Sequence, residues 1–143
     1  MIEIGSHERL SSASKPMVFV VDDDAAVLGS LRFLLETDGF AVRTFRNATA
    51  LLNARGAPSA DCYVIDYKMP DINGIELAGR LRRSGRDAPV ILITGYPDKN
   101  IAARAAAAGL KDVVLKPLLD ENLVKRVRSA IQNTGETDLR DST

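Results

Sequence analysis

The sequence has few of the residues that build disulfide or thiolate frameworks. Cys62 is the only cysteine, the chain has one histidine, and tryptophan is absent. An internal disulfide is therefore impossible, and the common zinc sites made of cysteine and histidine are excluded. We expect Cys62 to pack inside a buried strand rather than to act as a redox sensor.

The chain also lacks net charge and long hydrophobic runs. Nineteen Lys and Arg residues balance nineteen Asp and Glu residues, which removes any bulk electrostatic case for binding nucleic acid or an anionic membrane. No apolar run approaches the roughly 20 residues of a membrane span, and the N-terminus has no apolar stretch of the signal-peptide kind. We therefore expect a cytoplasmic protein with neither a nucleic-acid nor a membrane partner.

What the chain does have is a regular alternation of short apolar strands and amphipathic helices. Its 143 residues, 45% of them hydrophobic, suit one globular domain. The apolar runs predict five strands, at 17–21, 40–45, 62–66, 89–94 and 112–116. Helices are predicted from Asp24 to Gly39, at 48–55, 75–83 and 98–109, and in a last segment with Leu119, Leu123, Val127 and Ile131 in one stripe.

Buried strands joined by helical crossovers predict a doubly wound α/β fold, in which a five-stranded parallel sheet has helices on both faces. The predicted domain covers residues 17–132. We expect residues 1–16 to be a flexible N-terminal extension and residues 133–143 to be a polar tail.

In this fold class, ligands bind beyond the carboxyl ends of the strands, so the residues at those ends are the first candidates for a site. Asp22, Asp23 and Asp24 follow the first strand, and Asp66, Thr94 and Lys116 end the third, fourth and fifth strands. Each has an ordinary structural explanation when taken alone: helix capping for the three aspartates, a turn for Asp66 and Thr94, and surface exposure for Lys116.

Taken together, these residues supply the components of phosphoryl transfer to a carboxylate. Asp66 would be the nucleophile, because an ionised carboxylate can form an aspartyl phosphate. The neighbouring aspartates offer the oxygen ligands that Mg²⁺ prefers. Thr94 and Lys116 would neutralise charge on the transferring group.

Four segments carry a resemblance to a known family. They are VVDDD at 20–24, DYKMPDINGIEL at 66–77, ITG at 93–95 and LKP at 115–117. With these segments in this order, the chain resembles a two-component response-regulator receiver domain from about residue 18 to residue 131. The resemblance implies the (βα)5 flavodoxin-like fold, with the strand order 2-1-3-4-5.

The resemblance also implies a role for each site residue. Asp66 would take a phosphoryl group from a phosphohistidine on a sensor histidine kinase or a histidine phosphotransfer domain. Mg²⁺, for which Mn²⁺ can substitute, would be bound by Asp22, Asp23, Asp66 and the main-chain carbonyl of Lys68. Thr94 and Lys116 would contact the phosphoryl oxygens, and Asp24 would cap the first helix. The Lys116–Pro117 bond is usually cis in this family, against about 5 to 6% of X-Pro bonds in general.

One position departs from the family pattern. Receivers usually have Tyr or Phe three residues before the lysine, where this chain has Val113. We expect phosphorylation to survive this change and the usual readout through a moving ring to be altered. Tyr96 is a candidate replacement by position alone. A receiver-like interaction domain with altered or lost phosphorylation switching is therefore the main alternative. A haloacid-dehalogenase-type phosphatase is disfavoured, because this chain has Lys68 where that family has its second aspartate.

The segment after Ile131 is too short for a DNA-binding or enzymatic domain, so we expect a stand-alone regulator that acts through protein contacts. Its downstream target is not identified by the sequence. The Ala-rich fourth helix, the fifth strand and the last helix would form an output face or a homodimer contact. We expect no enzyme activity beyond self-catalysed phosphotransfer and autodephosphorylation.

Overall fold

The structure, a computed structural model, describes residues 15–54, 59–95, 98–116 and 121–142, with side chains in the last segment described for 122–133. Tyr96, Pro117, Leu119 and most of the expected N-terminal extension lie outside the described residues, so the cis Lys116–Pro117 bond and the role of Tyr96 stay predictions. None of the described helices is long and apolar enough to cross a membrane.

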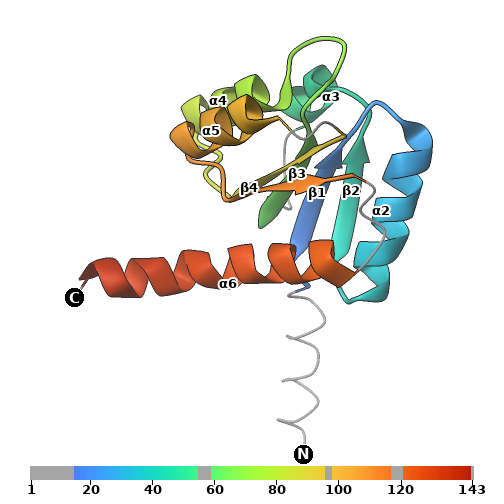
Figure 1. Cartoon of the computed structure of the whole chain (residues 1–143). Helices are drawn as coiled ribbons and strands as arrows, with labels where there is room; N and C mark the ends of the chain where they lie inside the picture. Colours follow the sequence, from blue (N-terminus) through green and yellow to red (C-terminus); the bar gives the residue numbers. More distant parts are fainter. Residues whose placement is uncertain (1–14, 55–58, 96–97, 117–120, 143) are drawn as a thin grey trace, which may run out of the picture.

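Five strands and five helices alternate along the described chain (Figure 1). The strands are β1 (Met17–Val21), β2 (Ala41–Phe45), β3 (Cys62–Asp66), β4 (Val90–Thr94) and β5 (Asp112–Leu115). The helices are α2 (Ala25–Thr37), α3 (Ala48–Asn53), α4 (Gly74–Arg83), α5 (Lys99–Ala107) and α6 (Glu121–Ser142). The strands pair in parallel in the order β2-β1-β3-β4-β5, which confirms the predicted fold class.

The sheet separates two hydrophobic cores, because successive side chains of a strand point to opposite faces. Val20, Val64 and Ile93 face α2 and α6, while Phe19, Ile65 and Leu92 face α3, α4 and α5. Burial of both faces explains why the strands read as continuous apolar runs. Cys62 is buried in the first of these cores, and burial raises the pKa of its thiol to about 12.

The helix boundaries follow local hydrogen-bonding chemistry, with some departures from the sequence-based expectation. Asp24 caps α2 by accepting hydrogen bonds from the amides of Ala26 and Val27, as predicted. The chain leaves α2 through Gly39, whose φ of +100° favours glycine. In α4, Leu77 is fully buried whereas Ile75, expected on the apolar face, is only partly buried.

Two helices differ in length from the prediction. α3 ends at Asn53, two residues earlier than expected. α6 continues to Ser142 through the segment expected to be a tail. The polar composition of residues 133–142 removes an apolar stripe from this part, which is why the sequence pattern gave no helix signal there.

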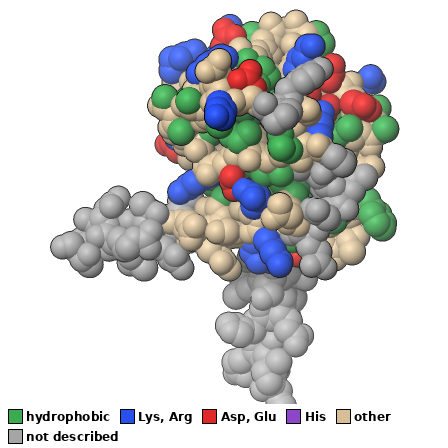
Figure 2. Space-filling view, viewed as in Figure 1, with side chains coloured by type: hydrophobic (Ala, Val, Ile, Leu, Met, Phe, Trp, Pro, Cys, Tyr) green, Lys and Arg blue, Asp and Glu red, His purple; other side chains and the backbone are tan. Residues whose placement is uncertain are grey.

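The strand register brings the predicted site residues to one edge of the sheet. Asp66 pairs with Ile93, and Thr94 pairs with Leu115, so β3, β4 and β5 end nearly level. The ladder continues one step further, since the amide of Lys116 donates to the carbonyl of Thr94 at 2.8 Å. On the face drawn in Figure 2, acidic, basic and hydrophobic side chains are interspersed, in keeping with the zero net charge.

Candidate functional site

Three aspartates form an acidic cluster at the carboxyl edge of the sheet. Asp22, Asp23 and Asp66 each place a carboxylate oxygen within 4.8 Å of the others. Asp22 and Asp66 are buried, with 0% and 4% of their surface exposed, whereas Asp23 is exposed. Next to the cluster lies a cavity of about 520 Å³, hereafter the acidic cavity, lined by Asp23, Asp24, Asp66, Lys68, Met69, Pro70, Thr94, Gly95 and Lys116.

Lys116 lies between the two buried carboxylates. Its Nζ atom is 3.0 Å from Oδ2 of Asp22 and 3.3 Å from Oδ1 of Asp66. A buried carboxylate without a partner would be strongly unfavourable, so this ammonium group offsets the cost of placing two acids below the surface. The lysine joins the end of β5 to the ends of β1 and β3.

The surroundings of Asp66 change its acidity. Burial and the nearby Asp22 carboxylate raise the pKa of Asp66 to about 6, although Lys116 opposes the change. Burial acts to lower the pKa of the Lys116 ammonium, but Asp22 and Asp66 outweigh it, so its pKa is raised above the usual value. At neutral pH, Asp66 is ionised and Lys116 is charged, as a nucleophile and its electrostatic partner must be.

The adjacent aspartates after β1 have different tasks. Asp24 caps α2 through its side chain, while its amide donates to Oδ1 of Asp22 at 2.9 Å. This hydrogen bond fixes the buried Asp22 carboxylate, and Asp23 makes no ion pair within the described residues. The structure thus assigns Asp24 to helix capping and places Asp22 and Asp23 in the cluster.

The loop between β3 and α4 approaches the end of β3 closely. The amide of Gly74 donates to the carbonyl of Tyr67 at 2.8 Å. A Cβ atom at Gly74 would lie 2.6 Å from the carbonyl oxygen of Asp66 and 2.6 Å from Cδ1 of Leu92. Only glycine therefore allows α4 to begin against the backbone of Asp66.

Sequence reasoning missed a second anchor of the same loop. Oδ2 of Asp71 accepts hydrogen bonds from the amide and the hydroxyl of Thr49, both at 3.2 Å, and Oδ1 accepts from the amide of Ile72. These hydrogen bonds lower the pKa of Asp71 despite the opposing effect of desolvation. Asp71 thus fastens the loop that contains Lys68 to the start of α3. In the sequence, Asp71 next to Pro70 indicates only a turn, and nothing in that pattern points to Thr49 as its partner.

A second missed contact starts at the residue after Asp66. The Nη1 atom of Arg104 donates to the hydroxyl of Tyr67 at 3.1 Å, and its guanidinium lies 5.8 Å from the centre of the Tyr67 ring. This pair links the end of β3 to α5. Val113 is partly buried and packs against the same hydrophobic core as Tyr67.

A family model for the response regulator receiver domain matches residues 18–128. Among the curated relatives, the transcriptional regulatory protein FixJ of Bradyrhizobium diazoefficiens is 39% identical over 119 residues, which are 83% of this chain and 58% of FixJ. The response regulator protein TmoT of Ectopseudomonas mendocina is 35% identical over 81% of this chain and 53% of TmoT. The chain thus spans between half and three fifths of the length of these relatives.

Solved structures show the same relationship. The crystal structure of FixJ-N has a TM-score of 0.72 and 33% identity, and the match covers 83% of this chain and 95% of that one. The BeF3-activated receiver domain of DrrB, a Thermotoga maritima protein, has a TM-score of 0.75 and 29% identity over 82% of this chain and 98% of that one. With its sheet order, its clustered aspartates and these matches, the chain belongs to the response regulator receiver domain family of two-component signalling proteins.

Proposed function

We propose that this receiver domain accepts a phosphoryl group on Asp66 from a phosphohistidine of a sensor histidine kinase or a histidine phosphotransfer domain. The observation that carries the proposal is the position of Lys116, whose ammonium group contacts both Asp22 and Asp66 beside the acidic cavity. An aspartate that only served a turn would have a solvated carboxylate and would need no such partner. The arrangement instead suits a nucleophile held beside a cation.

In the proposed reaction, a carboxylate oxygen of Asp66 attacks the phosphorus of the donor. The P–N bond of the phosphohistidine breaks, and the imidazole nitrogen keeps the electron pair. The ring leaves as neutral imidazole, because its other nitrogen already carries a proton or the ring takes one from water. Lys116 then moves from the carboxylates to a phosphoryl oxygen, and the buried hydroxyl of Thr94 donates to another. Hydrolysis by water at phosphorus would return Asp66 to its free form.

The donor set fits Mg²⁺. Three carboxylates lie within 4.8 Å of one another, and hard divalent cations prefer oxygen ligands. Asp22, Asp23, Asp66 and the Lys68 carbonyl would hold the ion, and Mn²⁺ would be accepted by the same oxygens. When bound, the ion supplies positive charge that lowers the repulsion between the carboxylates and an incoming phosphoryl group.

The readout proposed for this chain does not use an aromatic ring on β5. Val113 occupies that position, whereas Tyr67 follows the phosphoacceptor directly and is tied to Arg104 on α5. A shift of the β3 end upon phosphorylation would therefore be passed to α5 by the Tyr67–Arg104 pair. Tyr96 stays a separate prediction.

We further propose that α5, β5 and α6 form the surface that signals to a protein target or to a second copy of the chain. β5 is one of the two edge strands of the described sheet, and its residue Leu115 is 49% exposed. Signalling by protein contact in the cytoplasm is part of this proposal.

The proposal is tested by labelling with phosphoramidate, a small phosphodonor, with and without Mg²⁺. We expect Mg²⁺-dependent labelling of the wild type and loss of labelling in Asp66→Asn. Asp87→Asn is the matched control, because Asp87 is an exposed aspartate that precedes β4, at the end of the strand away from the acidic cluster, and this variant should still be labelled. A wild type that accepts nothing from small donors or kinases would favour the receiver-like interaction domain instead.

A further inference from the structure

The loop between β3 and α4 brings the backbone of Lys68 to the acidic cavity. Lys68, Met69 and Pro70 line this cavity, and they lie between Tyr67, which follows β3, and Asp71. A side-chain ligand can rotate toward an ion, but the direction of a main-chain carbonyl is set by the backbone dihedral angles of its loop. The path of this loop therefore decides whether the Lys68 carbonyl faces the cavity.

The loop is fixed at its first end by the backbone of Tyr67. The amide of Tyr67 donates to the carbonyl of Ile93 at 2.8 Å, which continues the pairing of β3 with β4. The carbonyl of Tyr67 accepts from the amide of Gly74 at 2.8 Å, where the chain enters α4. Both backbone polar groups of Tyr67 are thus hydrogen-bonded, so Lys68 follows a fixed residue.

Asp71 fixes the loop at its second end. Oδ2 of Asp71 accepts from the amide and the hydroxyl of Thr49, both at 3.2 Å, and Oδ1 accepts from the amide of Ile72 at 3.0 Å. The amide of Thr49 belongs to the first turn of α3, where backbone amides have no partner within the helix. The Asp71–Thr49 contact therefore joins the loop to α3.

Only three residues separate the two fixed points, namely Lys68, Met69 and Pro70. Pro70 has a restricted φ angle and also disfavours helical conformations of the residue before it. The partly buried Met69 packs against the hydrophobic core that contains Ile65 and Leu77. Because the segment is short and held at both ends, the Asp71–Thr49 contact limits the directions that the Lys68 carbonyl can take.

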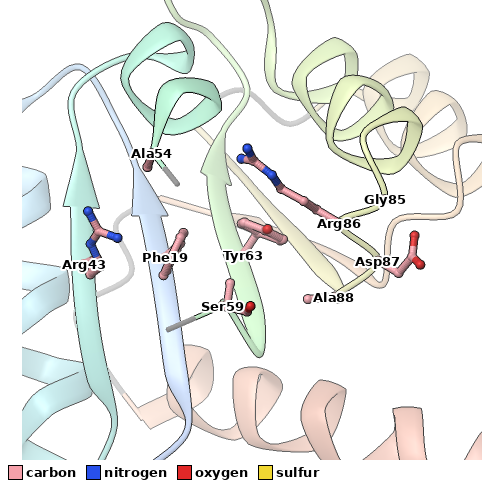
Figure 3. Close-up of a pocket in the computed structure, with 10 residues that line it drawn as sticks. Phe19, Arg43, Ala54, Ser59, Tyr63, Gly85, Arg86, Asp87 and Ala88 are labelled. Carbon is pink, nitrogen blue, oxygen red and sulfur yellow. The ribbon is translucent and has the colours of Figure 1, made fainter. Parts of the chain in front are cut away.

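α3 is itself held firmly enough to support this contact. Its residues Ala48 and Leu51 are buried in the core. At the other end of the helix, the guanidinium of Arg86 donates to the carbonyls of Leu51 and Leu52 at 3.2 and 3.1 Å. Figure 3, a view of a separate cavity of about 330 Å³, shows the Arg86 side chain pointing toward α3 from the segment before β4. Thr49 is thus part of a helix fixed at both ends.

From these contacts we infer that Asp71 is a positioning residue for the metal site: through Thr49 it holds the loop so that the Lys68 carbonyl faces the acidic cavity as a ligand. This inference rests on the magnesium ligands of the proposed function. Asp71 lies outside the carboxylates that come within 4.8 Å of one another, so it acts through the backbone of the loop rather than as a ligand.

The test is a titration of the ¹³C,¹⁵N-labelled protein with Mg²⁺ alone, without a phosphodonor. A spectrum that correlates the amide of Met69 with the carbonyl carbon of Lys68 observes the proposed ligand directly. We expect this signal to shift saturably in the wild type. In Asp71→Ala the dissociation constant for Mg²⁺ should rise roughly tenfold, the lower end of the effect of residues that support a metal ligand. This constant refers to the folded protein, so a loss of stability alone would leave it unchanged.

Variants of Thr49 separate the contact from the charge of Asp71. Thr49→Val removes the hydroxyl but keeps the aspartate, and the affinity for Mg²⁺ should fall roughly threefold. Thr49→Ser keeps the hydroxyl and should bind Mg²⁺ like the wild type. The double variant Asp71→Ala/Thr49→Val should bind like Asp71→Ala, because the hydroxyl has already lost its partner. Asp87→Ala, which removes an exposed aspartate before β4, is the matched control and should not change the affinity.

Equal affinities of the wild type, Asp71→Ala and Thr49→Val for Mg²⁺ would overturn the inference, even if both variants unfold at lower urea concentration. A wild type that binds Mg²⁺ without a shift at the Lys68 carbonyl would overturn it as well. Neither result would affect the proposed phosphorylation of Asp66, which labelling by phosphoramidate tests separately. A wild type that binds no Mg²⁺ would overturn both this inference and the proposed Mg²⁺ dependence.

Discussion

Nζ of Lys116 lies 3.0 Å from Oδ2 of Asp22, a residue with no exposed surface. This ion pair links the residue that follows β5 to the residue that follows β1. The same ammonium group is 3.3 Å from Asp66. One lysine thus stabilises the acidic cluster before phosphorylation and is placed to contact the phosphoryl group afterwards. Structure and proposed chemistry depend on the same side chain.

Removing this lysine should destabilise the protein. Lys116→Met leaves two buried carboxylates without their cation, and we expect the free energy of unfolding to fall by about 2 to 3 kcal/mol at neutral pH. This is less than the cost of breaking a fully buried ion pair, because Lys116 is partly exposed. Urea unfolding in the presence of EDTA measures this change in the free energy of unfolding. Added Mg²⁺ should recover part of the loss. Lys111→Met removes an exposed lysine and should change little; equal effects of the two substitutions would contradict the role of Lys116.

The pKa of Asp66 predicts a specific pH dependence. It is raised from 3.8 to about 6 on folding, so the folded state binds the proton more tightly and the contribution of Asp66 to stability falls as pH rises through this range. Above pH 6 the ionised Asp66 costs up to about 3 kcal/mol. Without metal, Asp66→Asn should therefore be more stable than the wild type at neutral pH.

The difference between Asp66→Asn and the wild type should narrow as pH falls from about 6 toward 3.8, where the wild-type carboxyl is protonated in the fold. Thermal unfolding across this range in EDTA provides the measurement. Mg²⁺ should stabilise the wild type more than the variant, because the variant lacks one carboxylate ligand. A constant stability difference at all pH values would refute the raised pKa.

Gly74 should tolerate no side chain. In Gly74→Ala the new Cβ atom would clash with the backbone oxygen of Asp66 and the side chain of Leu92. We expect the free energy of unfolding to fall by about 1 to 3 kcal/mol and Mg²⁺ binding to weaken. Gly79→Ala, in the same helix, is the matched control. Its Cβ atom would come no closer than 3.5 Å to Arg83, so alanine should stabilise the helix by up to about 1 kcal/mol. Equal destabilisation by both would show that the close approach to Asp66 has no special role.

The Tyr67–Arg104 pair should couple the phosphorylation site to α5. In a double-mutant cycle with Tyr67→Phe and Arg104→Ala, we expect a coupling free energy of about 0.5 to 1.5 kcal/mol. In Arg104→Ala, beryllofluoride should still bind, but the amide shifts that it causes in α5 should shrink. Undiminished shifts in α5 would remove this pair from the proposed readout.

Much of the fold and the centre of the site follow from the sequence because both depend on local patterns. Apolar runs at strand length and caps such as Asp24 place the elements, and a parallel sheet brings Asp66, Thr94 and Lys116 to one edge. The predicted strands differ from the observed ones by at most one residue at either end. Predicting these features requires no knowledge of how the helices pack against one another.

Contacts between distant segments could not be predicted in this way. The hydrogen bonds of Asp71 to Thr49 and of Arg104 to Tyr67 depend on how α3 and α5 sit against the β3–α4 loop. Likewise, α3 ends at Asn53, although the sequence pattern continues for two more residues. Periodicity shows which face of a helix is apolar, but not how much of the sheet a short helix covers.

Chemical mapping of the phosphoryl group tests the central claim most directly. An aspartyl phosphate is reduced by borohydride to homoserine, which peptide mass spectrometry locates in the chain. After Mg²⁺-dependent labelling by phosphoramidate, the proposal predicts homoserine at residue 66, and none in Asp66→Asn. Homoserine at another aspartate, or a labelled protein without any at residue 66, would contradict the assignment of Asp66 as the phosphoacceptor.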